Sequence, residues 1–453
     1  MLNEGERWRL LQGDCLGVLK ELPAESAHAL VCDPPAGIEF MSQAWDHHKG
    51  GRAQWVQWFA SVMREALRVL KPGAHGLVWA MPRTQHWTMT GLEDAGFAIR
   101  DVIAHINGQG WPKGSNASIA IDRKMGAARE GGTSKAYAGR GGRPVVPKTQ
   151  TETYGVERDP GGDVRVSTAP ATAEAQQWDG WHSGLKPAFE PWILVQKPFR
   201  GSIAKNLLEH GVGALNIDAC RIPCEGGSPS QARRDTAAIS GNIGTNGSGG
   251  LEDRTSLLRF TEHRAGESLG RYPSNAIFSH NSDCTAERGC TFGCAVYLLE
   301  RQSGKRKSGA MRAGGERTVA QHNAYGAPSG LQTKHEITAN EGTAARFFYC
   351  PKAKAEDARG GPGNTHPTVK HPELMAYLCK LVTPPDGIVL DPFAGSGSTG
   401  VAALAEGFRF VGIEQNGAYR EIAEQRLDGK RVERSPAQAD NPKASKRGGG
   451  KAK

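Results

Sequence analysis

Two apolar segments that each run into a tight turn lie at opposite ends of this 453-residue chain, and they most constrain its fold. The first spans residues 27–35 and ends in an aspartate followed by two prolines. The second spans residues 388–404, where a short apolar run meets a glycine-rich turn and then a helix-like stretch. Each segment is typical of a buried strand that opens into a loop. Both loops are therefore expected at the carboxyl ends of strands, the edge at which open α/β sheets bind ligands.

Strand-like and helix-like stretches alternate in both end regions of the chain. Strands are predicted at residues 8–13, 27–33, 75–81, 97–106, 191–197, 388–391 and 408–414, and helices at residues 55–70, 370–381 and 400–404. Lys71, Pro72 and Gly73 are expected to separate the first of these helices from the strand that follows it. This alternation predicts an α/β fold with a largely parallel sheet.

The middle of the chain is polar and rich in glycine, so little of it can form a core. Residues 107–175, 226–271 and 304–341 are of this kind, and we expect loops or segments that order on a partner. The C-terminal tail is basic and without periodicity, and it is expected to be disordered. These shifts in composition divide the chain into four regions: 1–106, 107–363, 364–433 and 434–453.

The net charge of +9 favours a polyanionic partner such as nucleic acid. The sequence contains no apolar run of roughly 18 residues or more, and its N-terminus lacks the basic-then-apolar layout of a signal peptide. We therefore expect a soluble intracellular protein. Nine cysteines, an odd number spread over a long chain, argue against a disulfide framework and predict reduced thiols.

Four of the metal-ligating side chains lie close together in the sequence. His280, Cys284, Cys290 and Cys294 could supply the ligands of a zinc ion. Their spacings match no common zinc-finger pattern, which favours ordinary free thiols and no metal. Zinc remains the alternative.

The glycine-rich turn at residues 393–397 lets the backbone approach a ligand closely, because glycine has no Cβ. Alone, such a turn could serve a dinucleotide, a phosphate or only a tight corner. Glu414 ends a strand about twenty residues further on, the separation at which an acid can accept the ribose hydroxyls of an adenosine-containing cofactor. Asp14 ends another strand and could face the adenine amine of that cofactor or cap a helix.

At these residues the chain resembles the S-adenosylmethionine-dependent DNA amino-methyltransferases, which act on adenine N6 or cytosine N4. Asp33, Pro34 and Pro35 look like the catalytic motif of that family, and residues 391–397 look like its cofactor loop. Residues 67–73 and 364–370 are similar to two further family segments, the corner after the catalytic strand and the stretch that flanks the cofactor.

The order of the motifs, catalytic first and cofactor loop last, resembles the β class of the family. In that class the DNA-recognition region lies between the two motifs, here within residues 107–363. Residues 190–198 and 216–222 are similar to segments of phage- and prophage-type members. The resemblance implies a catalytic half at 1–106 and a cofactor-binding half at 364–433.

The resemblance also implies a Rossmann-like methyltransferase sheet with helices on both faces, a loop-rich target-recognition insert, S-adenosylmethionine as cofactor and duplex DNA as substrate. A homodimer and a cytoplasmic, nucleoid-associated location in a bacterial or phage system follow from it as well. The implied catalytic residues are Asp33, Pro34, Pro35 and Phe40. The implied cofactor-binding residues are Asp14, Asp33, Thr365, His366, Pro367, Asp391, Phe393, Gly395, Gly397, Glu414 and Asn416.

The chemistry explains the motif. An aromatic amine is a weak nucleophile, so the carboxylate of Asp33 and the carbonyl of Pro34 are expected to accept its hydrogen bonds as methyl transfer begins. The chain departs from the family at Ala36, where most members carry an aromatic ring that stacks on the flipped base. Phe40 or Trp45 could replace that ring from the adjacent loop, although the motif dictates neither position and Phe40 could equally be a core residue.

Aspartate at the first motif position favours adenine N6 over cytosine N4 as the target. Two other functions stay open. One is a catalytically weak DNA-binding regulator, motivated by Ala36 and the basic inserts, and the other is methylation of RNA.

Overall fold

The computed structural model describes residues 1–39, 44–47, 49–108, 114–129, 131–133, 156–158, 164–167, 169–223, 270–281, 284, 289–291, 293–307, 341–351, 361 and 363–429. The chain divides into two compact units. The first combines Met1–Gly108 with Phe189–Lys453, and the second is Gln109–Ala188.

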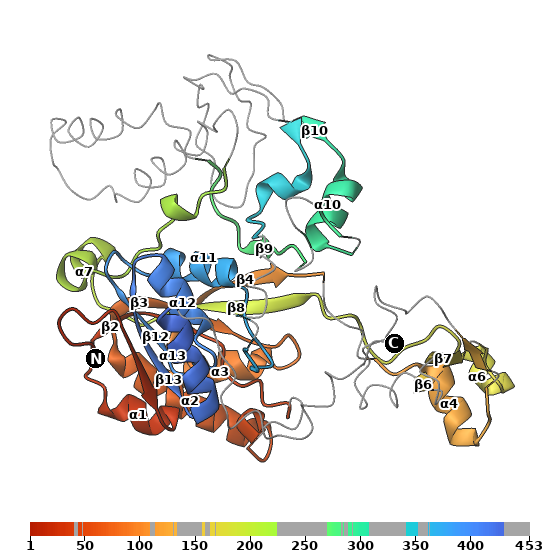
Figure 1. Cartoon of the computed structure of the whole chain (residues 1–453). Coiled ribbons are helices and arrows are strands. Elements are labelled where there is room, and N and C mark those ends of the chain that lie inside the picture. Colours follow the sequence, from red (N-terminus) through yellow and green to blue (C-terminus); the bar gives the residue numbers. More distant parts are fainter. Residues whose placement is uncertain are drawn as a thin grey trace, which may run out of the picture. The chain divides into compact units, whose positions relative to one another are not determined.

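An eight-stranded sheet forms the centre of the first unit, in the order β1-β13-β12-β2-β3-β8-β4-β9 (Figure 1). Its strands are β1 (Trp8–Gln12), β2 (Ala27–Cys32), β3 (Leu70–Trp79), β4 (Ala98–Ile106), β8 (Phe189–Gln196), β9 (Ala276–Phe278), β12 (Ile388–Asp391) and β13 (Arg409–Glu414). The strands from β1 to β3 in this order are parallel. β8 runs antiparallel to both of its neighbours, and β9 is parallel to β4. The sheet is therefore largely parallel, as predicted.

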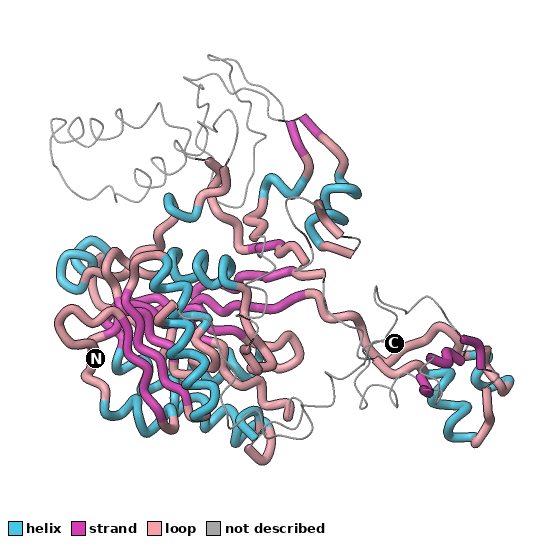
Figure 2. Tube along the Cα trace, viewed as in Figure 1, coloured by secondary structure: helices cyan, strands magenta, loops and turns pink. Residues whose placement is uncertain are grey.

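Helices cover both faces of this sheet, and the alternation of side chains along β2 shows why. Leu30 and Cys32 point to one face, where they join a core built with helices α1 (Cys15–Glu21), α2 (Arg52–Val69) and α3 (Gln85–Ala95). Ala29 and Val31 point to the other face, whose core includes residues of α11 (Pro372–Val382), α12 (Ser398–Ala405) and α13 (Gly417–Leu427). Figures 1 and 2 show this layered arrangement. The predicted α/β class is confirmed.

The chain leaves β2 and β12 in opposite directions along the sheet. β2 continues through α2 into β3, whereas its neighbour β12 continues through α12 into β13 on the other side. Val389 of β12 pairs with Ala29 of β2, so the two strands lie directly side by side. A crevice opens at the carboxyl ends of two strands whose connections diverge in this way, and ligands bind there.

The corner at Lys71, Pro72 and Gly73 differs from the prediction, because β3 begins at Leu70 and runs through these residues. Ala27 of β2 pairs with Leu70, but Ala29 pairs with His75, so the register shifts across the corner. Gly73 has a φ of 81°, which bends the strand without ending it.

The remaining described helices and strands are short. In the first unit they are α7 (Ile203–His210), α10 (Ala295–Ser303), β10 (Arg306–Lys307), β11 (Glu341–Gly342) and the 3-10 helices η2 (Ala44–Asp46), η4 (Asp218–Cys220) and η6 (Ala344–Phe347). In the second unit they are α4 (Ala117–Met125), α6 (Ala173–Gln177) and a three-stranded sheet of β5 (Gly131–Thr133), β6 (Val156–Arg158) and β7 (Val164–Ser167).

A buried carboxylate organises the second unit. Asp122 of α4 is 2% exposed and accepts hydrogen bonds from the backbone N–H groups of Ala171 and Thr172 at 3.0 and 3.1 Å. Arg129 pairs with the same carboxylate. Asp122 therefore ties α4 to the start of α6.

The cysteines within the described residues are all free thiols. Within the same residues, no helix combines the length and the apolar character needed to cross a membrane.

Candidate active site

Glu414 connects the end of β13 to the glycine-rich turn after β12. Its Oε2 accepts a hydrogen bond from the Gly395 N–H at 2.8 Å, and its Oε1 accepts one from the Asn416 N–H at 2.7 Å. Burial raises the pKa of Glu414, and these backbone donors oppose that rise. The carboxylate is thus fixed in orientation at the carboxyl end of the sheet.

Gly395 leaves no room for a side chain. Its φ is 54°, and a Cβ at this position would lie 2.9 Å from Nε2 of His366. Gly397, the N-cap residue of α12, has a φ of 77°, and a Cβ there would lie 3.0 Å from the Cβ of Ala423. Both glycines therefore let the turn adopt a left-handed backbone in a crowded place, as a close approach of backbone to ligand requires.

Asp391, the last residue of β12, is 2% exposed. Its Oδ1 accepts a hydrogen bond from the Phe393 N–H at 2.9 Å. Burial raises the pKa of Asp391 to about 7. This side chain holds the turn that follows the strand.

His366 forms one wall beside the glycine-rich turn. Its ring lies parallel to that of Trp45, with centroids 6.4 Å apart, and edge-on to that of Tyr419 at 4.5 Å. Burial lowers the pKa of His366 to about 4, so the ring is neutral near pH 7. The flanking Thr365 and Pro367 are exposed.

Two other predicted cofactor residues cap helices in the structure. Asp14 accepts a hydrogen bond from the Gly17 N–H at 3.0 Å at the start of α1, which confirms the capping interpretation. Asn416 caps α13 by accepting from the N–H groups of Ala418 and Tyr419. Because Gln12 of β1 pairs with Glu414, Asp14 lies near the same edge of the sheet.

Asp33 follows β2 at the predicted position, and its carboxylate has a cationic partner. Lys370 Nζ lies 2.8 Å from Asp33 Oδ2, and the side chains are 15% and 21% exposed, respectively. Burial raises the pKa of Asp33, and the Lys370 ammonium opposes that rise. Pro34 is buried and Pro35 is half-buried beside it.

Lys370 belongs to a larger network of charged and polar groups. Its ammonium lies 4.2 Å from the ring centroid of Trp79, and the indole N–H of Trp79 donates to Glu190 Oε2 at 2.9 Å. Burial opposes the charge of Lys370, but the carboxylates of Asp33 and Glu190 raise its pKa above the ordinary value. The ammonium therefore stays protonated between two carboxylates.

The same network continues to the β9 edge of the sheet. Burial would raise the pKa of Glu190, but the interaction with His105 and the charge of Lys370 lower it to about 2. His105 Nδ1 lies 3.9 Å from Glu190, and its Nε2 lies 2.8 Å from the hydroxyl oxygen of Ser279. Strands β3, β4 and β8 thus all contribute a polar group next to the Asp33 site.

The loop after the two prolines is held by a buried acid. Gly37 has a φ of 68° and donates its N–H to Asp46 Oδ1 at 2.7 Å. Asp46 is 0% exposed, and the carbonyl of Ala36 accepts from the Thr84 hydroxyl at 3.3 Å. This loop therefore has its own anchor, independent of an aromatic side chain at position 36.

The aromatic replacement for position 36 remains a prediction. Phe40 lies outside the described residues, whereas Trp45 lies beside His366 and the glycine-rich turn. Trp79 is the aromatic ring linked to Asp33 through Lys370.

Five residues of this network were not predicted as site residues from the sequence: Lys370, Glu190, Trp79, His105 and Ser279. Two of them could have been predicted from the sequence. Trp79 ends β3, the neighbour of β2, and Lys370 lies in the segment 364–370 that resembles a family segment. The involvement of Glu190 and His105 depends on the antiparallel placement of β8, which a linear pattern does not reveal.

Several known proteins are similar to parts of this chain. Residues 317–425 match a family model described as DNA methylase. The type II methyltransferase M.HindIII of Haemophilus influenzae is 21% identical over 243 residues, which cover 46% of this chain and 64% of that protein. The DNA adenine methyltransferase YhdJ of Escherichia coli (strain K12) is 46% identical over 63 residues, which cover 14% of this chain and 21% of that protein. The chain thus spans less than two thirds of each relative.

The solved structure of the M1.HpyAVI–SAM complex superposes with a TM-score of 0.34 at 13% sequence identity, covering 93% of this chain and 100% of that chain. The family match includes β12, β13 and the glycine-rich turn between β12 and α12. Residues 317–425 therefore belong to the DNA methylase family that the motifs of this chain resemble.

Proposed function

We propose that this protein transfers a methyl group from S-adenosylmethionine to the N6 amine of an adenine in duplex DNA. One observation carries the proposal. The Asp33 motif and the glycine-rich turn follow two adjacent strands, β2 and β12, at the point where the connections of the sheet diverge. The two segments, far apart in the sequence, would therefore face a single crevice. The Asp33 motif suits the target amine, and the glycine-rich turn suits the methyl donor.

The residues of the glycine-rich turn fit the cofactor. Gly395 allows the backbone to approach, and Glu414 presents a fixed carboxylate that suits a pair of ribose hydroxyls. The neutral ring of His366, stacked near Trp45, offers a flat apolar wall. S-adenosylmethionine, when bound, supplies an electrophilic methyl group on its sulfonium.

Asp33 would accept a hydrogen bond from the amine of the target base. Lys370 engages Oδ2, which orients the carboxylate and stabilises its charge, while Oδ1 is the second acceptor of the group. As the nitrogen attacks the methyl carbon it gains positive charge, which a carboxylate at this position stabilises. The carbonyl of Pro34 would accept a hydrogen bond from the second N–H of the amine, and the following proline places no competing backbone N–H there.

Adenine is proposed over cytosine because the first motif residue is Asp33. The net charge of +9 suits the phosphates of DNA, and residues 107–363 would contain the target-recognition region. We also propose that the protein acts as a homodimer in the cytoplasm, associated with the nucleoid. The roles of Asp14, Thr365, Pro367 and Phe40 remain part of this proposal.

The test is methylation of mixed-sequence duplex DNA with radiolabelled S-adenosylmethionine, followed by digestion and mass identification of the labelled nucleoside. We expect N6-methyladenine. Label in N4-methylcytosine would correct the target base, and label confined to single-stranded RNA would replace DNA by RNA as substrate. Tight DNA binding without any label would favour the regulator.

Asp33→Ala sharpens this test. It should abolish transfer and leave cofactor affinity nearly unchanged, because it removes the acceptor for the amine. The matched control is Asp94→Ala, which removes an exposed carboxylate on α3 and should leave transfer intact. Normal turnover by Asp33→Ala would refute the assignment.

A further inference from the structure

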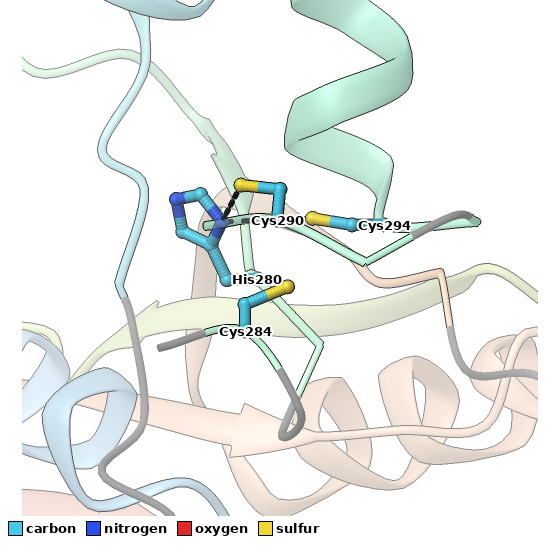
Figure 3. Close-up of side chains that lie close together, drawn as sticks. All are labelled: His280, Cys284, Cys290 and Cys294. Atoms are coloured by element: carbon cyan, nitrogen blue, oxygen red, sulfur yellow. Dashed lines mark hydrogen bonds between the residues drawn. The ribbon is translucent and has the colours of Figure 1, made fainter. Parts of the chain in front are cut away.

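Four metal-ligating side chains converge beyond the end of β9, and none of them is a member of the Asp33 network. His280 comes two residues after β9, Cys284 and Cys290 lie in the loop that follows, and Cys294 directly precedes α10 (Figure 3). We propose that these residues bind one structural zinc ion.

The distances fit tetrahedral coordination. Nδ1 of His280 lies 3.3 Å from Cys290 Sγ and 3.5 Å from Cys294 Sγ. All four ligand atoms lie within 4.8 Å of one another. Zn–S bonds of about 2.3 Å and a Zn–N bond of about 2.0 Å at tetrahedral angles place nitrogen about 3.5 Å and sulfur about 3.8 Å from each sulfur ligand. The two distances from His280 Nδ1 match these values, and the remaining ligand atoms lie within about an ångström of them.

The surroundings of the sulfur atoms suit thiolates. The backbone N–H of Thr291 donates to Cys284 Sγ at 3.3 Å, an interaction that stabilises a negatively charged sulfur bound to zinc. Cys294 is the N-cap residue of α10, so its sulfur lies near the positive end of the helix dipole. Cys284 and Cys294 are both 0% exposed. A metal would compensate the charge of buried thiolates at this position.

The hydrophobic cluster around these cysteines is small, so a bound metal would contribute to the stability of this region. Besides the two buried cysteines, the buried members of this hydrophobic cluster are Val296 and Ala345. Segments with so little apolar surface are commonly stabilised by a metal or a disulfide. The described cysteines form no disulfide, which leaves the metal.

The ligand set predicts the role of the ion. Three cysteines and one histidine fill all four positions of a tetrahedral zinc, so the site has no open position for water or substrate. The ion would join the end of β9 to the start of α10, because His280 comes two residues after β9 and Cys294 is the N-cap residue of α10. The site is therefore structural, and its existence does not depend on the proposed methyl transfer.

The experiment measures metal in the full chain, purified without a metal-affinity tag. Mass spectrometry of the metal content should find about one zinc per chain. Cys284→Ser and Cys290→Ser should each lose most of this zinc. The matched control is Cys350→Ser, since Cys350 packs on the same cluster but its sulfur contacts the backbone carbonyls of Ala345 and Phe348. This control should keep its zinc.

A measurement on the unmodified protein covers the case in which the ligand variants misfold. A mercurial thiol reagent should release zinc into a chromogenic chelator, and cobalt exchanged into the site should give the visible absorption of tetrahedral thiolate coordination. Absence of zinc after purification and after incubation with excess zinc would overturn the proposal. Equal zinc in Cys284→Ser, Cys290→Ser and Cys350→Ser would overturn it as well.

Discussion

The ion pair between Asp33 and Lys370 predicts a shift in the pH dependence of methyl transfer when the lysine loses its charge. In Lys370→Met the side chain keeps similar length, but the ammonium 2.8 Å from Asp33 Oδ2 is gone. Burial already raises the pKa of Asp33, and Lys370 opposes that rise. Without the lysine, the pKa of Asp33 should therefore rise further.

The magnitude follows from the distance and the exposure. At 2.8 Å a unit charge pair is worth about 6 kcal/mol at an effective dielectric constant of about 20 and about 1.5 kcal/mol in water. The Asp33 side chain is 21% exposed, so an intermediate value applies. Loss of an interaction of this size should raise the pKa of Asp33 further and move the acidic limb of the activity profile to higher pH.

The direction of the shift in the pH profile follows from the ionised form of Asp33, because the carboxylate accepts the hydrogen bond from the amine. Activity is lost as the pH falls through the pKa of Asp33, so a raised pKa moves the acidic limb of the profile to higher pH. Steady-state kcat/KM measured from roughly pH 5 to pH 9 reports this limb for the free enzyme. Lys370→Met should be most impaired at low pH and should approach the parent rate at high pH.

Two variants serve as controls. Lys370→Arg keeps the charge and should keep the position of the limb. Lys380→Met breaks an ion pair of 2.9 Å between Lys380 of α11 and Glu406 at the end of α12, and should leave the profile unchanged. A loss of rate in Lys370→Met by the same factor at every pH would refute the electrostatic argument.

Three further outcomes are expected. Glu414→Gln should weaken S-adenosylmethionine binding by about tenfold or more, because a charged acceptor is lost; an unchanged Kd in calorimetry would contradict the ribose assignment. Trp55→Ala should lower the free energy of unfolding by about 3–5 kcal/mol in a denaturant titration, since Trp55 is 0% exposed and stacks on Phe59 at 5.0 Å; a loss below about 1 kcal/mol would show that the site repacks. Asp122→Ala leaves Arg129 without its carboxylate partner and removes the acceptor of the Ala171 and Thr172 N–H groups, so limited proteolysis should cut within residues 109–188 first; unchanged cleavage would contradict the role of Asp122.

Local patterns in the sequence predicted the elements that build the site. The apolar run of β12 followed by glycines, and the carboxylate of Glu414 at the end of β13, were both recognisable because strand ends and turns leave a local signature. Their meeting in one crevice followed from the parallel arrangement. The role of the glycine turn as a cofactor site remains a prediction.

The cationic partner of Asp33 could not be predicted in the same way. Glu190 approaches Lys370 because β8 inserts antiparallel between β3 and β4. Lys370 itself lies just before α11, far from Asp33 in the sequence, so neither pairing leaves a local signal. The prediction of a corner at Pro72 was also wrong. The sequence shows turn residues there, but it does not show that they lie within β3, whose pairing with β2 shifts register at this point.

The order of the strands also has a consequence for how the protein is made. β2 ends at Cys32, whereas its neighbour β12 ends at Asp391, and within the described strands β1 pairs with β13 alone. At about 5–20 residues per second, roughly 20–70 s of synthesis separate the two neighbours. During that time β2 presents an apolar strand edge whose backbone N–H and C=O groups are not yet paired, and such an edge can pair with strands of other chains. Ribosome-bound chaperones would then shield the early strands, and chains truncated before β12 should aggregate rather than retain partial activity.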